Sequence, residues 1–111
     1  MERESPLKLL IILTVRFGAN GITAFALNGY RHFDRARISA DFLLLNEPPE
    51  RVRREIEGNG GRIYVMPDRN KNPLGYLVRL SRLIRENGYD VVHAHGNSAT
   101  LYVEMLAARL G

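Results

Sequence analysis

The 111-residue sequence contains no cysteine. Without thiols, the chain forms neither disulfides nor sulfur-ligated metal sites, which fits the reducing cytoplasm. A long hydrophobic run is also missing, because the longest apolar block, residues 9–13, is far shorter than the roughly 20 residues that cross a bilayer. A signal peptide begins with a positively charged segment, but Glu2 and Glu4 add negative charge there, and no cleavage site of small residues follows. We therefore expect a cytoplasmic protein with neither a transmembrane helix nor a signal peptide.

Low-complexity linkers and internal repeats are absent too, so the sequence indicates one globular domain. Its composition, 45% hydrophobic and 25% charged, is that of a soluble domain with a core of ordinary size. A formal net charge of +4 favours anionic neighbours such as phosphates, nucleic acid or an acidic membrane surface. Aromatic side chains are not interleaved with the charges, so we do not expect a nucleic-acid partner.

Apolar strand-like runs alternate with helical patterns along the chain. We expect strands at residues 7–15, 40–46, 62–67 and 89–95, and helices at residues 22–33, within 47–61, at 72–88 and from Asn97 or Ser98 onward. The first strand is hydrophobic almost without interruption, which is typical of a parallel sheet covered on both faces. The sequence thus predicts an α/β fold, a Rossmann-like doubly wound parallel sheet with four strands in the order 3-2-1-4.

The expected helices also have predictable ends and faces. Asn72 before Pro73 predicts a capped start for the third helix, and Gly88 predicts its end. In the first helix, one stripe at helical spacing is expected to face the sheet: Ile22, Phe25, Ala26, Gly29 and Phe33. The outward arginines of the second and third helices form either a solvated face or a contact with an anionic membrane: Arg51, Arg53, Arg54, Arg79, Arg82 and Arg85.

With the strand order 3-2-1-4, a crevice lies between the first and fourth strands, at the carboxyl edge where open α/β sheets bind ligands. Two loops meet there, at residues 16–21 and 93–98. Gly18 and Gly21 in the first loop permit a positive φ and let a phosphate or sugar approach the main chain. A plain glycine-containing turn is equally compatible with the pattern.

Two histidines end the fourth expected strand. Because side chains alternate along a strand, His93 and His95 share a face. We expect His93 to be hydrogen-bonded and packed under a helix, and His95 to emerge at the rim. At the rim, His95 either faces a ligand, to which it donates a hydrogen bond or transfers a proton, or is a surface side chain with no functional role. We expect no metal site, because no third ligand lies at a suitable spacing, and the sequence requires no cofactor.

Three stretches resemble a known family: FGANGITAFALNGYRHFD at residues 17–34, DFLLLNE at 41–47, and residues 60–99, which end in DVVHAHGNSA. They are similar to the N-terminal Rossmann-like domain of GT-B glycosyltransferases, within glycosyltransferase family 4, and to bacterial capsular or exopolysaccharide members above all. In that family, the first loop usually carries two consecutive glycines, and Asp-Val-Val-His-x-His is frequent at the fourth strand.

The resemblance implies a retaining hexosyltransferase that moves a sugar from a nucleotide-sugar donor to a lipid-linked or saccharide acceptor in polysaccharide biosynthesis. His95 matches the family's second histidine, which lines the sugar site, and is the implied catalytic residue. Gly21 matches the second glycine of the first loop, and Asn20 stands in place of the first. The expected substrate-binding residues are Gly18, Asn20, Gly21, Asn97 and Ser98.

Family members continue into a C-terminal Rossmann domain that binds the donor, and this sequence does not contain it. We therefore expect residues 1–111 to be the acceptor-side half, inactive alone, with an outer fourth-strand edge open to homodimer formation. The expected location is the cytoplasm, peripheral to the inner face of the membrane. Two other functions remain open: a stand-alone α/β module that binds a nucleotide or another anion, and a basic interaction domain.

Overall fold

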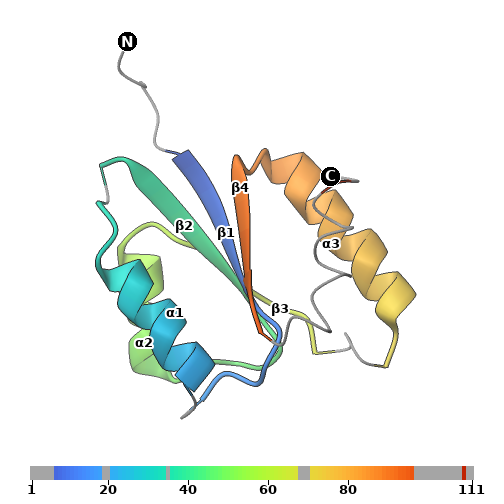
Figure 1. Ribbon diagram of the computed structural model, residues 1–111, viewed down its shortest axis with the longest axis horizontal. Helices are drawn as coiled ribbons and strands as arrows, with labels where there is room; N and C mark the ends of the chain where they lie inside the picture. The colour runs from blue at the N-terminus through green and yellow to red at the C-terminus, as the bar shows by residue number, and fades with distance from the viewer. Residues whose placement is uncertain (1–6, 19–20, 35, 68–70, 97–108, 110–111) are drawn as a thin grey trace.

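The computed structural model describes residues 7–18, 21–34, 36–67, 71–96 and 109. Its centre is a four-stranded parallel sheet in the order β3-β2-β1-β4 (Figure 1). The strands are β1 (Leu7–Leu13), β2 (Ile38–Leu44), β3 (Ile63–Val65) and β4 (Val91–His95). This order confirms the predicted fold and places the change of winding direction between β1 and β4.

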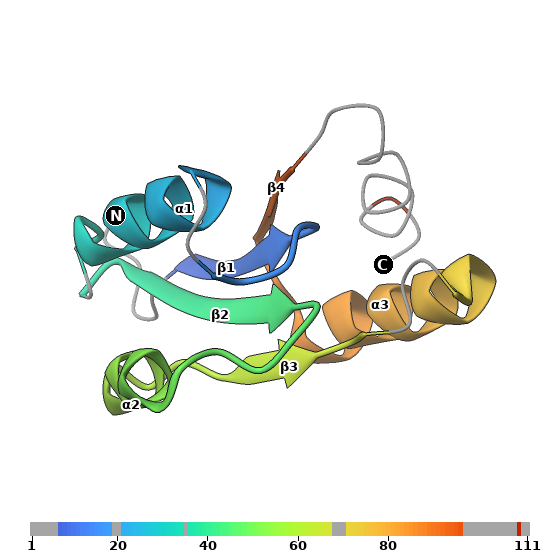
Figure 2. The same cartoon turned by 90° about the horizontal axis from the view of Figure 1, so that it is seen from below.

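Among the described residues, three helices cover the two faces of the sheet (Figure 2). They are α1 (Gly21–Arg31), α2 (Glu50–Gly58) and α3 (Pro73–Asn87). Helices α1 and α2 pack on one face and α3 on the other, which is the doubly wound arrangement. The predicted last helix, from Asn97 or Ser98 onward, lies outside the described residues except for Arg109. Within the described residues, no helix is both long enough and apolar enough to cross a bilayer.

From Leu9 to Leu13, strand β1 is hydrophobic without alternation because this part of the strand is buried on both faces. Leu9 and Ile11 belong to the core under α1 and α2, whereas Leu10 and Ile12 belong to the core under α3. β1 is paired on both edges, with β2 on one side and β4 on the other. This part of β1 meets water neither at its edges nor on its faces, so a polar side chain is not favoured there, whereas Lys8 near the start of the strand is exposed.

The ends of α3 follow the sequence prediction. The Asn72 side chain accepts a hydrogen bond from the backbone N–H of Gly75 at 3.1 Å, and Pro73 opens the first turn. Gly88 ends the helix in the left-handed conformation with φ of 62°, which glycine adopts without steric penalty.

The predicted inner stripe of α1 is wrong in part. Phe25 was expected to face the sheet, but its side chain is 70% exposed. The residues of α1 that are buried are Thr23, Ala26, Leu27 and Tyr30. Tyr30 decides the rotation of α1, because its fully buried ring packs edge-on against Phe42 of β2 at 5.1 Å between centroids. Phe25 consequently lies on the flank of α1 that faces β4.

Strand β4 is an edge strand, and no strand pairs with its outer edge in the part of the chain that the structure describes. Its face on the α1 side is incompletely covered, since Val91 is 43% exposed. Such an unpaired edge offers main-chain hydrogen-bonding groups to another strand. Homodimer formation through this edge stays a prediction.

Candidate functional site

The chain segments that leave β1 and β4 are joined at the carboxyl edge of the sheet. Both the backbone N–H and the hydroxyl of Thr14 donate hydrogen bonds to the carbonyl oxygen of His95, at 3.0 and 3.2 Å. Leu13 and His95 are also register partners in the parallel pairing of β1 with β4. The first loop and the second histidine therefore start from adjacent positions at the point where the winding direction changes, which is where open α/β sheets bind ligands.

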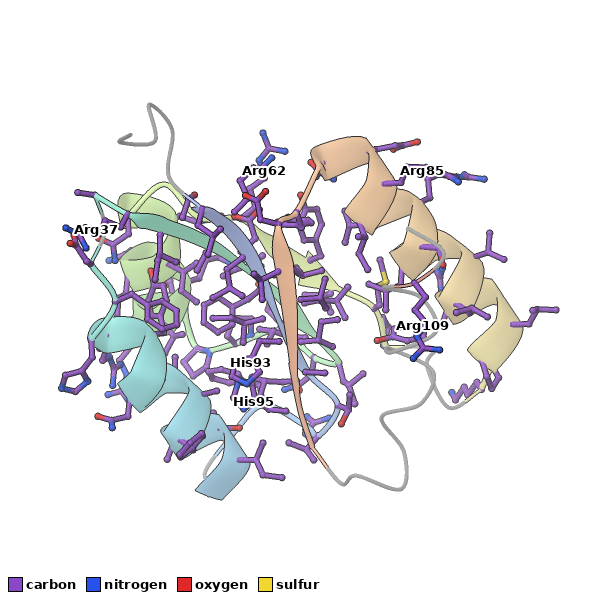
Figure 3. All side chains as sticks on the ribbon, turned by 45° about the horizontal axis from the view of Figure 1, so that its top comes forward. Arg37, Arg62, Arg85, His93, His95 and Arg109 are labelled. Atoms are coloured by element: carbon purple, nitrogen blue, oxygen red, sulfur yellow. The ribbon has the colours of Figure 1, made fainter. Side chains whose placement is uncertain are left out.

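His95 is the last residue of β4 and is half-buried. Its ring contacts Phe25 of α1 in an edge-on geometry at 5.9 Å and lies 4.2 Å from the ring of His93, measured between centroids. Both histidines lie on the side of β4 that faces α1 (Figure 3). Burial, followed by the charge of His93, lowers the pKa of His95 below its ordinary value. At neutral pH the imidazole is thus uncharged, with one nitrogen that donates and one that accepts a hydrogen bond.

The expected packing of His93 is wrong. Its side chain is exposed, and no hydrogen bond to it is found within the described residues. The reason is that α1 reaches only the carboxyl end of β4, where Phe25 meets His95, and leaves the preceding positions of the strand's face open. The two histidines do share a face, as predicted, but their order of burial is the reverse of the expected one.

Asn46 holds the loop after β1 in place, and the sequence reasoning missed it. Its side-chain oxygen accepts a hydrogen bond from the N–H of Phe17 at 2.6 Å, and its amide nitrogen donates to the carbonyl oxygen of Phe17 at 3.1 Å. Phe17 is itself buried in the core. The available signal was an asparagine directly after the apolar run of β2, where a polar residue at the carboxyl edge can reach a neighbouring loop.

Replacing Asn46 by alanine is expected to lower the free energy of unfolding by about 2 kcal/mol, because both backbone groups of Phe17 lose their partner in a part-buried position. Denaturant unfolding measures this change. Asn28→Ala, at an exposed position of α1, is the matched control and should change stability by less than about 0.5 kcal/mol. Equal stability of the two variants would show that the Asn46 contacts do not hold the loop.

A pocket of about 860 Å³ lies between α1 and α2 and includes the first loop. Gly18 and Gly21, two of the predicted substrate-binding residues, both line it. The wall is apolar at Leu27 and Val52, and Arg51 supplies a cation. His95 is not among the described residues that line this pocket, since its contact with α1 is made through Phe25 on the other flank of the helix.

The two loop glycines are not required by the backbone. Among the described glycines, only Gly60 and Gly88 have a positive φ, so Gly18 and Gly21 do not use the left-handed conformation that glycine permits. A Cβ atom built at either loop glycine would meet no other atom within 4 Å. Neither conformation nor packing against the protein therefore explains these glycines, and the space beside them is open.

Comparison with known proteins gives the family. Residues 20–111 match the family model described as a glycosyl transferase 4-like domain. The chain belongs to the glycosyl transferase 4-like family. It is also 35% identical over 103 residues to a protein named "Putative glycosyltransferase EpsF" from Bacillus subtilis (strain 168), in a match that covers 89% of this chain and 27% of that relative. The glycosyl transferase 4-like chain thus spans about a quarter of the length of this relative. No solved structure matches it.

Three predicted site residues of this glycosyl transferase 4-like chain, Asn20, Asn97 and Ser98, lie outside the described residues. Their roles stay predictions, as do those of Gly18, Gly21 and His95. No cluster of three or more potential metal ligands occurs within the described ranges. What the geometry provides is a neutral half-buried imidazole beside the exit of β1, and an open, glycine-lined pocket on the other flank of α1.

Proposed function

We propose that the chain forms the acceptor-side half of a retaining glycosyltransferase with the GT-B fold. The enzyme would move a hexose from a nucleotide-sugar donor to a lipid-linked or saccharide acceptor in polysaccharide biosynthesis. The supporting observation is that the exit of β1 and His95, two segments far apart in sequence, are hydrogen-bonded through Thr14 at the carboxyl edge of the sheet. Membership of the glycosyl transferase 4-like family supports the reaction class.

His95 would act on the transferred sugar. In the reaction, the bond between the sugar and the donor phosphate breaks, and a bond forms between the sugar and an acceptor oxygen. Negative charge develops on the departing nucleotide diphosphate, whose phosphate oxygen takes the proton that the acceptor hydroxyl loses. A neutral imidazole is suited to donate a hydrogen bond to a sugar hydroxyl or to a developing negative charge. The lowered pKa of His95 keeps it in that neutral form at physiological pH.

The carboxyl edge of the sheet is one wall of the proposed site. Transfer requires donor and acceptor to be held in a reactive geometry, which one open wall does not provide. We therefore propose that a second Rossmann-like domain binds the donor, and that residues 1–111 alone do not transfer sugar. The proposed location is the cytoplasm, at the inner face of the membrane, where a lipid-linked acceptor would be reached.

The coding sequence after Gly111 and a transfer assay test this function. We expect a second α/β half that carries two glutamates spaced for a donor site, and we expect the longer product to transfer radiolabelled sugar from a nucleotide-sugar to an acceptor lipid. Residues 1–111 alone should show no transfer above background. A stop codon directly after Gly111 without a partner gene would contradict the proposal, and so would full transfer activity in residues 1–111.

A second candidate is a stand-alone module that binds a nucleotide or another anion. The pocket between α1 and α2 favours it, because Arg51 lies beside an apolar wall of suitable size for a small ligand. Tight binding of a free nucleotide by residues 1–111, lost in Arg51→Gln, would favour this module over the transferase half.

A further inference from the structure

Helices α2 and α3 both carry outward arginines, and two of the three on α2 are neutralised. Arg53 forms ion pairs with Glu47 and with Glu57, the latter at 3.1 Å, and Arg54 pairs with Glu50 at 2.8 Å. Arg51, which lines the pocket between α1 and α2, forms no ion pair among the described residues, whereas Arg53 and Arg54 are balanced by carboxylates of α2 and by Glu47.

The arginines of α3 differ from these. Arg79, Arg82 and Arg85 are exposed, and none of them forms an ion pair in the part of the chain that the structure describes. Figure 3 shows Arg85 extending from α3 away from the sheet. Glu86 is the one exposed carboxylate of α3, so this helix keeps a net positive charge that is available to a partner, whereas two of the three arginines of α2 are already paired.

Two apolar side chains lie on the same outer surface of α3. Leu74 is 72% exposed and Val78 is 49% exposed, although large aliphatic side chains are favoured in the interior. They are four residues apart and therefore neighbours on one side of the helix. Arg82 and Arg85 continue the same stripe by further steps of four and three residues. This face of α3 is therefore apolar near the start of the helix, at Leu74 and Val78, and basic toward its end, at Arg82 and Arg85.

We infer that this outer face of α3, formed by the stripe of Leu74, Val78, Arg82 and Arg85 with Arg79 beside Arg82 on its flank, docks on an anionic lipid bilayer. Three unpaired guanidinium groups complement anionic headgroups, and the two aliphatic side chains gain by leaving water for the acyl boundary. Nucleic acid would satisfy the charge but would leave both aliphatic side chains exposed, and α3 offers no exposed aromatic ring on which bases could stack. An acidic bilayer satisfies both features.

The position of Leu74 sets the orientation of the docked molecule. Helix α3 begins after the carboxyl end of β3, so Leu74 lies at the end of the helix next to the carboxyl edge of the sheet (Figure 2). Insertion of Leu74 and Val78 would tilt that edge toward the lipid. Docking itself does not depend on the proposed transfer activity. The significance of this orientation rests on the proposed function, because a lipid-linked acceptor would then reach the carboxyl edge of the sheet directly from the membrane.

Sedimentation with lipid vesicles tests the docking. Residues 1–111 should bind vesicles of equal parts phosphatidylglycerol and phosphatidylcholine, and should not bind phosphatidylcholine alone. The triple variant Arg79→Gln, Arg82→Gln, Arg85→Gln should reduce the partition coefficient about 100-fold, since each arginine near an anionic surface contributes a factor of about five. Glutamine has a helix propensity close to that of arginine, so α3 should remain folded, which circular dichroism verifies.

The matched control removes the same charge elsewhere. Arg37→Gln, Arg53→Gln, Arg54→Gln also lowers the formal net charge from +4 to +1, but all three arginines are ion-paired. This variant should keep vesicle binding within about fivefold of the parent chain. Leu74→Ser with Val78→Ser should lower binding about tenfold, and the loss should persist at high salt.

Three outcomes would overturn the inference. They are no preference for phosphatidylglycerol vesicles, an equal loss in the two triple variants, and unchanged binding in the serine double variant. Binding to double-stranded DNA that exceeds vesicle binding, and that the α3 triple variant abolishes, would assign the face to nucleic acid instead. All of these outcomes are independent of whether the longer protein transfers sugar.

Discussion

Replacing His95 by alanine in the longer transferase is expected to lower kcat by between about 100-fold and 1,000-fold, the usual cost of removing one well-placed hydrogen-bond donor or proton-transferring group. The imidazole is half-buried between β4 and Phe25, so its removal should cost the fold little. Initial-rate measurements with saturating donor and acceptor give kcat, and thermal unfolding verifies that the variant is folded. An unchanged kcat would end the assignment of His95 as a catalytic residue.

His93→Ala is the matched control, and it adds a pH signature. His93 is exposed and is expected to contribute less than about tenfold to kcat. It nevertheless lowers the pKa of His95, because a second cationic charge at 4.2 Å between ring centroids is unfavourable. Activity that requires neutral His95 should fall as the pH drops through that pKa. Without His93 the pKa of His95 rises, so the acid limb of the kcat profile should move to higher pH. An unmoved acid limb would show that another group governs it.

Replacing Gly61 by alanine should destabilise the chain by about 3 kcal/mol or more, near the upper end for overpacked sites. After α2, the chain turns back tightly, and the N–H of Gly61 donates to the carbonyl oxygen of Ile56 at 2.9 Å. A Cβ at Gly61 would lie 2.5 Å from the carbonyl oxygen of Ala40 and 2.9 Å from Cγ2 of Ile56. Because Ala40 belongs to β2 in the centre of the sheet, relief requires α2 or β3 to move. Denaturant unfolding measures the loss.

Gly58→Ala is the control for the same substitution. Gly58 is the last residue of α2, and a Cβ there would meet no atom within 4 Å. In a helix, alanine is favoured over glycine, so this variant should be neutral or more stable by up to about 1 kcal/mol. If Gly61→Ala were as stable as Gly58→Ala, the close approach of the α2 turn to β2 would not be a constraint on the fold.

The fold could be predicted because its determinants are local or strongly patterned. The apolar run from Leu9 to Leu13 in β1 indicated a strand buried on both faces, and Asn72 and Gly88 marked the ends of α3 through capping geometry that depends on a few neighbouring residues. The alternation of strands with helices then limited the number of possible sheet topologies, because crossovers between parallel strands are right-handed. The strand order followed from these features.

The details of the site depend on packing between distant segments and could not be predicted in the same way. The rotation of α1 is set by Tyr30 against Phe42, so the exposed position of Phe25 and its contact with His95 were missed. The Asn46 clamp joins residues 29 positions apart. The exposure of His93 depends on how far α1 extends over the edge strand, which no periodicity in the sequence encodes.

Helix α1 contributes to both the pocket beside α2 and the surroundings of His95, which are otherwise separate. One flank carries Leu27 and lines the pocket shared with α2, and the opposite flank carries Phe25 against the ring of His95. Because α1 is one helix of eleven residues, a sideways shift of it would change the pocket and the distance between Phe25 and His95 together. A ligand in the pocket that shifted α1 would therefore also change the surroundings of the imidazole without touching it.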